Sequence, residues 1–324
     1  MSLERRQLGT TDLSITTVGF GAWAIGGSGW AYGWGSQDDA ASIAAIVRAV
    51  SRGLNWIDTA AIYGLGHSEE VIGRALRELP NSDRPLVFTK CGLRADPARP
   101  ELQPERYLTP ASIRAELDSS LRRLRLDQID LYQVHWPDKS GTPLEDSWGE
   151  MGRLVDEGKV RAVGVSNFTL DLLERAEAVR HVDSLQPPFS LIRRDSAADV
   201  IPWAAAHGTG VIVYSPLQSG ILTESFSRQR AAALAPDDWR RRSDDFQEPA
   251  LSRNLALRDA LVPIAKRHET SVSAVAIAWA ASFPGVTGAI VGARSAEQVD
   301  GWIDAATLQL TSSDRDQIKL ALTA

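Results

Sequence analysis

Cysteine is nearly absent from this chain, which has a single one, Cys91, among its 324 residues. One cysteine excludes an internal disulfide framework, and such sparse use is typical of a reducing compartment. The sequence also lacks any stretch near the roughly 18 consecutive apolar residues of a membrane span. Its opening segment, MSLERRQLGTTDLS, has no apolar run of the secretory type. We therefore expect a soluble, cytoplasmic protein without a membrane partner.

A basic excess is lacking as well, since 35 Lys and Arg stand against 41 Asp and Glu, a formal net charge of −6. Nucleic-acid-binding proteins usually carry a basic stripe. The densest basic segment, residues 237–246 (DDWRRRSDDF), is flanked by acidic residues, and we expect it to be a solvated loop. The composition favours a small-molecule partner over nucleic acid and leaves the oligomeric state open.

Two common catalytic patterns are also missing. The five histidines, at positions 67, 135, 181, 207 and 268, include no H-x-H or H-E-x-x-H spacing, so we expect no metal site. The segment GVSNF, residues 164–168, does not match the G-x-S-x-G motif of serine hydrolases. Metal-dependent and serine-dependent hydrolysis are therefore not indicated.

Short apolar runs rich in β-branched residues recur along the chain, and each is typical of a strand covered on both faces. Eight such runs are predicted strands: 16–23, 55–60, 86–90, 130–136, 160–167, 184–189, 210–217 and 288–293. Helical patterns separate them. The clearest covers residues 109–126, where Thr109 is a good N-cap, Pro110 suits the first turn and residues 113, 117, 121 and 124 form one apolar stripe.

Alternating strands and helices favour parallel pairing, and eight such units close naturally into a (β/α)8 barrel. We therefore predict one α/β domain over residues 1–324. Residues 5–15 are expected to form an N-terminal hairpin, and residues 218–250 to form an insertion after the seventh strand. A further segment, 256–269, is expected to be one helix.

Polar side chains follow three successive predicted strands. Asp58 lies near the end of the second strand and Tyr63 in its loop, while Lys90 ends the third strand and His135 lies near the end of the fourth. Catalytic groups of such barrels lie at the carboxyl ends of strands. Alternation places Lys90 on one face with residues 86 and 88, and His135 on one face with residues 131 and 133. We expect these four groups to meet at one rim.

That convergence has a chemical use. A free tyrosine is a weak acid near neutral pH, but a lysine ammonium nearby favours the phenolate, and a carboxylate can hold the lysine in place. Such a tyrosine can protonate a carbonyl oxygen, with a histidine bonding the substrate, and the reaction then needs a hydride from a nicotinamide cofactor. Each residue taken alone also has a purely structural interpretation.

The motifs around these residues resemble the aldo-keto reductase superfamily, most of all its bacterial branches of inositol-type and general stress reductases. The resemblance is carried, in order, by DTAAIYG (58–64), VFTK (87–90), DLYQVHWPD (130–138), VRAVGVSNF (160–168) and IVYSPLQSGIL (212–222). It implies a (β/α)8 barrel, NADPH, and a tetrad of Asp58, Tyr63, Lys90 and His135 with Tyr63 as the acid/base.

A dinucleotide fingerprint at the first strand is a false lead. GFGAWA, residues 19–24, fits G-x-G-x-x-G/A, and Asp38 and Asp39 lie near the distance expected of a ribose-binding acid. A pyrophosphate-binding helix must begin directly after that fingerprint. The glycine-rich run 25–39 argues against a helix there, so we reject a Rossmann unit.

Polar residues at later strand ends suit the nicotinamide. Ser166, Asn167 and Gln186 offer paired donors and acceptors for a carboxamide, and Tyr214 offers a flat face for stacking. Their alternative role is to satisfy loop backbone. By resemblance, Gly21, Ala22 and Trp23 line the nicotinamide end, and Ser215, Leu217 and Gly220 follow the pyrophosphate.

The segment after the eighth strand suits the far end of the cofactor. Gly292 permits close backbone approach, Ser295 can cap a helix whose N-terminus receives a phosphate, and Arg294 suits a 2′-phosphate. Gln298 matches the adenosine contact of the family. We therefore predict NADPH over NADH. Gly301 and Trp302 replace a Glu-Asn pair common in the family, so Trp302 either stacks on adenine or packs.

An aromatic group near the predicted rim indicates an apolar or sugar-like substrate; its members are Trp23, Trp30, Tyr32, Trp34 and Trp136. Loop packing explains the same residues equally well. The predicted activity is hydride transfer between NADPH and a small carbonyl or alcohol substrate. A regulatory NADPH-binding subunit with little turnover is the alternative, and a lyase or isomerase on the same barrel stays open.

Overall fold

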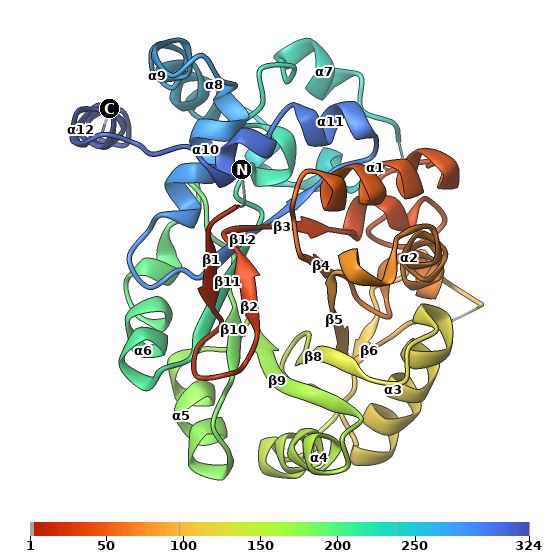
Figure 1. The fold of residues 1–324 in the computed structure, drawn as a ribbon. Coiled ribbons are helices and arrows are strands. Elements are labelled where there is room, and N and C mark those ends of the chain that lie inside the picture. Colours follow the sequence, from red (N-terminus) through yellow and green to blue (C-terminus); the bar gives the residue numbers. More distant parts are fainter. Residues whose placement is uncertain (1–2, 97, 237, 324) are drawn as a thin grey trace.

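The computed structural model describes residues 3–96, 98–236 and 238–323; residues 1, 2 and 324 of the predicted domain, and Asp237 of the basic segment, lie outside it. Eight parallel strands close into a barrel in the order β10-β11-β12-β3-β4-β5-β8-β9. This confirms the predicted barrel (Figure 1). Its strands are β3 (Val18–Gly21), β4 (Trp56–Asp58), β5 (Leu86–Cys91), β8 (Ile129–Val134), β9 (Val160–Ser166), β10 (Ser184–Gln186), β11 (Gly210–Tyr214) and β12 (Gly288–Gly292).

The predicted N-terminal hairpin is present. β1 (Arg5–Gln7) pairs antiparallel with β2 (Ser14–Thr16), and the pair crosses the front of the barrel in Figure 1. Leu8, Leu13 and Ile15 are fully buried in one cluster with Trp56 and other inward-facing barrel residues. The apolar residues of the hairpin therefore close the barrel at the end opposite the carboxyl ends of its strands.

Helices cover the outside of the barrel. α3 begins as predicted, because Thr109 accepts a hydrogen bond from the backbone of Ser112 and Pro110 occupies the first turn, where its missing N–H has no cost. The helices are α1 (Asp39–Ser51), α2 (His67–Glu78), α3 (Pro110–Leu124), α4 (Leu144–Asp156), α5 (Leu170–Val179), α6 (Val200–His207), α7 (Arg228–Ala232), α8 (Ala250–Ala260), α9 (Val262–Arg267), α10 (Val272–Ala281), α11 (Ala296–Asp300) and α12 (Ser312–Ala321).

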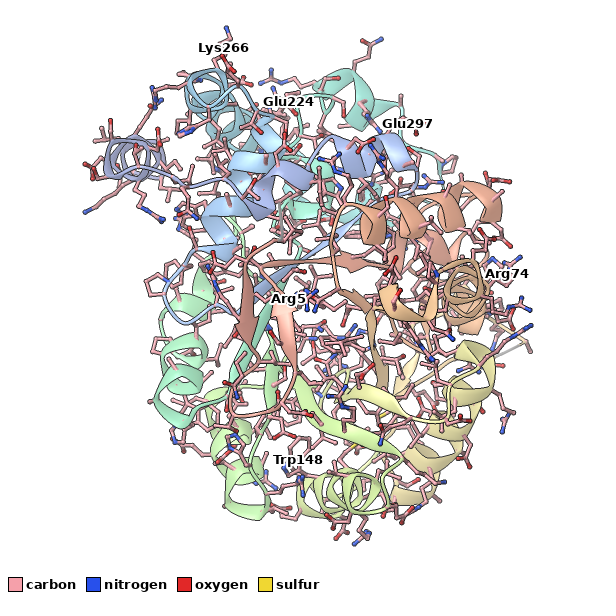
Figure 2. The ribbon with its side chains drawn as sticks, in the orientation of Figure 1. Arg5, Arg74, Trp148, Glu224, Lys266 and Glu297 are labelled. Atoms are coloured by element: carbon pink, nitrogen blue, oxygen red, sulfur yellow. The ribbon has the colours of Figure 1, made fainter. Side chains whose placement is uncertain are left out.

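Side chains fill the space between these helices and the strands (Figure 2). Trp148 of α4, labelled there, is fully buried, and its Nε1 donates to the carbonyl oxygen of Arg180. β3 is followed by a short 3-10 turn, and α1 begins only at Asp39. That order confirms the rejection of a Rossmann unit. In the described part of the chain, no helix is both long enough and apolar enough to cross a membrane.

Two local features differ from the prediction. The expected helix over 256–269 is wrong, because the chain forms α8 and α9 with a break at Leu261. Proline lacks the N–H needed inside a helix, so Pro263 is accommodated in the first turn of α9. An unpredicted antiparallel ribbon, β6 (Leu93–Arg94) with β7 (Glu105–Arg106), follows β5. The insertion after β11 contains α7 and three short 3-10 turns.

Candidate active site

Three of the predicted catalytic groups lie in direct contact at the carboxyl ends of β4 and β5. The Lys90 ammonium donates to Asp58 Oδ1 at 2.5 Å, to the carbonyl oxygen of Thr59 at 2.9 Å and to the Tyr63 hydroxyl at 3.4 Å. Lys90 and Asp58 are both buried. The ring of His135 meets that of Tyr63 edge-on, with centroids 5.6 Å apart. The structure therefore brings all four predicted residues together.

Two glutamines complete the environment of Asp58. Gln186 Nε2 donates to Asp58 Oδ2 at 2.8 Å, and Gln133 Nε2 approaches the same oxygen at 3.3 Å. Both glutamines are buried. Gln133 was not among the predicted site residues, although its alternation with Leu131 and His135 already placed it on their face of the strand. The two amides and Lys90 fix the carboxylate, so Asp58 positions the lysine and not the substrate.

The acidity of Tyr63 differs from expectation. Burial, followed by the neighbouring Asp58 carboxylate, raises the pKa of Tyr63 well above its ordinary value. The predicted lowering by Lys90 is wrong for this geometry, because burial disfavours the charged phenolate and the Asp58 carboxylate adds to that effect. Burial also lowers the pKa of Lys90, although Asp58 acts in the opposite direction. Tyr63 is therefore a protonated phenol at neutral pH, ready to donate.

His135 is a neutral imidazole at the same pH. Burial, with a smaller contribution from the Lys90 charge, lowers the pKa of His135 well below its ordinary value. Its backbone is held on both sides, since its N–H donates to the carbonyl oxygen of Cys91 and its own carbonyl oxygen accepts from Asn167 Nδ2 at 3.0 Å. A neutral imidazole can bond a substrate oxygen without adding charge.

The residues predicted for the carboxamide form a network of their own. Asn167 Nδ2 also donates to Ser166 Oγ at 3.0 Å, Ser166 Oγ donates to the carbonyl oxygen of Gln186 at 2.8 Å, and Tyr214 donates to Asn167 Oδ1 at 2.8 Å. Asn167 and Ser215 adopt positive φ angles of 61° and 58°. Non-glycine residues in this region carry strain, which concentrates at functional sites.

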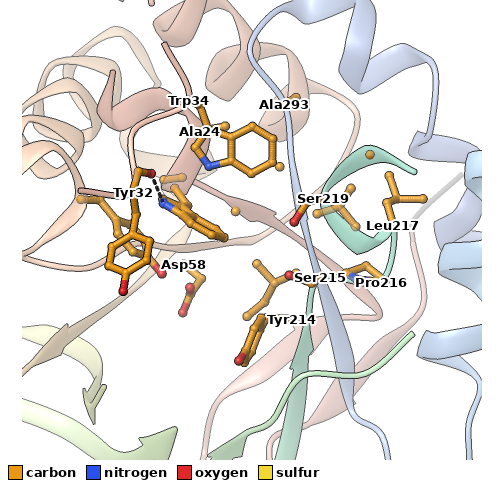
Figure 3. A pocket seen from close by; sticks show the side chains of 18 of the residues that line it. Ala24, Tyr32, Trp34, Asp58, Tyr214, Ser215, Pro216, Leu217, Ser219 and Ala293 are labelled. Carbon is orange, nitrogen blue, oxygen red and sulfur yellow. Dashed lines mark hydrogen bonds between the residues drawn. The ribbon is translucent and has the colours of Figure 1, made fainter. Parts of the chain in front are cut away.

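One cavity of about 650 Å³ connects these groups. In Figure 3 the side chains of Asp58, Trp34, Tyr214 and Ser219 surround the same space. Sixteen of the predicted site residues line it: Gly21, Ala22, Trp23, Asp58, Tyr63, His135, Ser166, Asn167, Gln186, Tyr214, Ser215, Leu217, Gly220, Gly292, Arg294 and Gln298. The other two do not, because Lys90 lies behind Asp58 and Tyr63, and Ser295 caps α11 through a hydrogen bond from the Gln298 backbone.

The predicted aromatic group lines the cavity in full. Trp23 Nε1 donates to the carbonyl oxygen of Tyr32 at 3.1 Å, the bond dashed in Figure 3. Trp239, from the insertion, stacks on Trp23 with centroids 5.3 Å apart. Trp34 meets both rings edge-on. The aromatic residues therefore wall the cavity and also join the first loop to the insertion.

Part of the basic segment 237–246 is correspondingly not a solvated loop. Arg240 forms an ion pair with the buried Asp238 at 2.6 Å, stacks over Trp34 and donates to the carbonyl oxygen of Ser219. Arg241 and Arg242 are exposed, as expected. The sequence signal for this correction was the tryptophan at the start of the arginine run.

Arg294 reaches across to the first loop. Its Nε donates to Gln37 Oε1 at 2.6 Å, and its two terminal nitrogens donate to the carbonyl oxygens of Trp34 and Ser36. Gln298 Oε1 accepts from the Arg294 backbone at 2.8 Å. Trp302 is almost fully buried within the main core, so it mainly packs, while part of it lines the cavity.

A model described as the Aldo/keto reductase family matches residues 17–322. The chain belongs to the aldo/keto reductase family. It is 35% identical to the aldo-keto reductase YhdN of Bacillus subtilis over 99% of this chain and 94% of that protein. It is 31% identical to an NADH-specific methylglyoxal reductase of Escherichia coli over 96% of each chain. The solved structure of the glycerol dehydrogenase AKR11B4 from Gluconobacter oxydans superposes with a TM-score of 0.89, at 37% identity, covering 100% of this chain and 96% of that one.

Membership makes this aldo/keto reductase an oxidoreductase that acts on carbonyl compounds, in a family that uses a nicotinamide cofactor. The cavity extends from the catalytic group (Asp58, Tyr63, Lys90 and His135), at the ends of β4, β5 and β8, to a set of arginines beside β11 and β12. Arg106 of the unpredicted ribbon is among the lining residues that were not predicted. The strands β6 and β7 of that ribbon have two residues each, too few to show a periodicity in the sequence.

Proposed function

We propose that this reductase interconverts a small aldehyde or ketone and its alcohol by hydride transfer with NADPH, with Tyr63 as the general acid/base. The observation that carries the proposal is the contact of the Tyr63 hydroxyl with Lys90, itself paired with Asp58, beside the neutral His135. When bound, the reduced nicotinamide supplies the hydride. The predicted cytoplasmic location is part of the same proposal.

Each residue of this group has a distinct role in the proposed reaction. Tyr63 donates its proton to the carbonyl oxygen as negative charge develops there. Lys90, which donates to the phenol oxygen, stabilises that oxygen as it loses the proton. Asp58 holds Lys90, and His135 orients the substrate oxygen. Lys90 and Asp58 are buried, whereas Tyr63 and His135 are half-buried at the cavity wall, so water has little access to the pair of lysine and carboxylate.

The residues that line the other end of the cavity, beside β11 and β12, fit a dinucleotide cofactor. Gly21 leaves room for a close approach, since a Cβ there would lie 2.7 Å from the side chain of Ile290. Arg230, Arg240 and Arg294 line the cavity near the ends of β11 and β12, where an anionic cofactor is stabilised by their charge. Ser166, Asn167 and Tyr214 would face the nicotinamide, and Ser215, Leu217 and Gly220 the pyrophosphate.

The preference for NADPH over NADH is supported by the free capacity of Arg294. A guanidinium has five N–H donors, and three serve Gln37, Trp34 and Ser36. Two donors are left for a 2′-phosphate. Dissociation constants of the two cofactors test this preference, and equal constants would refute it.

Substitution of Tyr63 by phenylalanine tests the assignment of the acid. Removing the hydroxyl leaves the ring packing in place, so Tyr63→Phe should lower kcat for aldehyde reduction by at least about 100-fold while NADPH affinity stays within about twofold. Steady-state rates and fluorescence titration measure the two quantities. Tyr132→Phe is the matched control, because that buried hydroxyl donates to the carbonyl oxygen of Ile113 outside the cavity. Near-normal turnover in Tyr63→Phe would contradict the role.

A further inference from the structure

Arg106 lines the cavity, and among the residues that the structure describes its side chain has no acceptor. Its guanidinium lies over the ring of Trp136, 4.2 Å from the ring centroid. Within the described residues, no carboxylate pairs with it and no side-chain or backbone oxygen accepts a hydrogen bond from it. Stacking holds a guanidinium by its face and leaves the donors on its edge available. Arg106 therefore presents a fixed, unpaired cation to the cavity.

The other lining arginines differ in this respect. Arg240 pairs with Asp238, Arg294 donates to the first loop, and Arg230 donates to Ser225 Oγ. The neighbouring Arg94, at the other position of the ribbon, pairs with Glu105 at 2.6 Å and stacks on Tyr107. The ribbon thus has one satisfied arginine outside the cavity and one unsatisfied arginine inside it.

Barrel topology separates Arg106 from the cofactor residues. Its ribbon follows β5, and Trp136 follows β8, next to the catalytic His135. In the strand order, β5 and β8 lie diametrically opposite β11 and β12, which Figure 1 shows on opposite sides of the barrel. Leu93, the register partner of Arg106, packs in the cluster that contains Tyr63 and Trp30. Arg106 therefore lies on the side of the catalytic group that is away from the cofactor residues, where the substrate would bind.

The other charged side chains that line the cavity do not neutralise the charge of Arg106. Asp58 is the carboxylate that holds Lys90 in the catalytic group, and it already accepts hydrogen bonds from Lys90 and two glutamines. Glu224 lies with the insertion, where it accepts hydrogen bonds from Val272 and Ser273 at the start of α10. Among the described residues, a substrate that enters beside His135 therefore meets aromatic rings and the unpaired guanidinium of Arg106.

From this geometry we propose that Arg106, held on Trp136, is a specificity-determining residue that selects carbonyl substrates bearing an anionic group, a carboxylate or a phosphate. The inference rests on the proposed reductase function and names its substrate class. The planar fork of a guanidinium matches both anions in a bidentate way, whereas the aromatic wall contacts the carbon skeleton. An uncharged aldehyde of the same length contacts only the aromatic wall and forms no ion pair with Arg106.

The experiment compares matched aldehydes in the full chain with NADPH. Succinic semialdehyde and butanal share four carbons and differ by the terminal carboxylate; glyceraldehyde 3-phosphate and glyceraldehyde test the phosphate. The wild type should prefer the anionic member of at least one pair in kcat/KM. Arg106→Gln should lower that preference by about 10- to 100-fold, mainly through KM. Arg106→Lys, which keeps the charge without the fork, should retain part of it, and Arg94→Gln should leave it unchanged.

Several outcomes would overturn the inference. An unchanged preference in Arg106→Gln, or an equal loss in Arg94→Gln, excludes the role of Arg106, and circular dichroism of both Arg106 variants verifies folding. Reduction of none of the four aldehydes by the wild type would instead refute the proposed function. In that case calorimetric binding of succinate to the NADPH-loaded protein decides the subsite. Weaker binding to Arg106→Gln supports it, and absent or equal binding overturns it.

Discussion

Two of the catalytic residues have shifted acidities, because burial raises the pKa of Tyr63 and lowers the pKa of His135. Strand alternation correctly placed Lys90 and His135 on inward faces, because a strand has a strict period of two. The raised pKa of Tyr63 is caused mainly by burial and then by the Asp58 carboxylate, which lies 2.5 Å from the Lys90 ammonium. No sequence pattern contains such a distance. Arg106 was missed for a related reason, since only the fold shows that it has no partner.

These acidities predict different pH profiles for the two directions of the proposed reaction. Reduction needs the protonated phenol of Tyr63, which the raised pKa preserves, and a neutral His135, which the lowered pKa preserves. The kcat/KM for aldehyde reduction should therefore stay level between roughly pH 6.5 and 9. Alcohol oxidation needs the phenolate, so its kcat/KM should still be rising at about pH 10.

Initial rates in both directions across buffers of constant ionic strength measure these profiles. A fall of reduction as the pH rises through about 6 to 7 would identify a protonated histidine as the acid. A plateau of oxidation already reached near pH 8 would show that Lys90 lowers the pKa of Tyr63 after all. The level profile and the late rise together are the pattern expected of a protonated Tyr63 and a neutral His135.

At the scale of elements, long periodic segments were predicted and short or interrupted ones were not. The helix after Thr109 combines a cap, a first-turn proline and an apolar stripe, and α3 follows that pattern. The segment 256–269 has helical composition throughout, yet Pro263 divides it. β6 and β7 have two residues each. Pairing across the loop determines such strands, and their own residues carry no signal.

One element-scale contact makes stability depend on pH. Glu116 of α3 accepts a hydrogen bond from the backbone of Gly92, at the start of the loop after β5. Burial is the main cause that raises the pKa of Glu116 from 4.5 to about 7, and the neighbouring Glu69 adds to it. Between these values the folded chain keeps a proton that the unfolded chain releases. The free energy of unfolding therefore falls as the pH rises from 4.5 to 7.

Substitution of Glu116 by glutamine should remove this pH-dependent loss of stability, because the amide stays neutral and its oxygen can still accept from the Gly92 backbone. At pH 8, Glu116→Gln should be more stable than the wild type by about 2 kcal/mol, a figure reduced from the full linkage value for partial exposure. At pH 4.5 the two should be equal. Urea denaturation at both values measures the difference, with Glu101→Gln, an exposed residue of the preceding loop, as control. A constant difference at both pH values would contradict the linkage.

At the scale of the whole molecule, the barrel was predictable because each unit repeats one local pattern, strand then helix. The contacts that close the cavity were not predictable, because they join segments that are far apart in the sequence. Arg294, after the last strand, bonds Trp34, Ser36 and Gln37 of the first loop, and Trp239 of the insertion stacks on Trp23. These contacts depend on the closed barrel, which brings β12 beside β3.

Cofactor binding should therefore stabilise the molecule as a whole, and unequally for the two nucleotides. A ligand that binds only the folded state at 100 times its dissociation constant adds about 2.7 kcal/mol, a rise in Tm on the order of 5 °C for a chain of this size. We expect NADPH to raise Tm more than NADH at equal concentration, because the two free donors of Arg294 are available to the 2′-phosphate. Differential scanning calorimetry at several cofactor concentrations measures both shifts.

The variant Arg294→Gln separates this role from the structural one. Loss of the bonds to the first loop lowers Tm without cofactor, so the informative quantity is the difference between the NADPH and NADH shifts within each variant. That difference should shrink toward zero in Arg294→Gln and persist in Arg315→Gln, which removes an arginine of α12 whose side chain, among the described residues, donates only to Ser282. If the difference survives in Arg294→Gln, then the 2′-phosphate is held elsewhere and Arg294 serves only to join the two ends of the barrel.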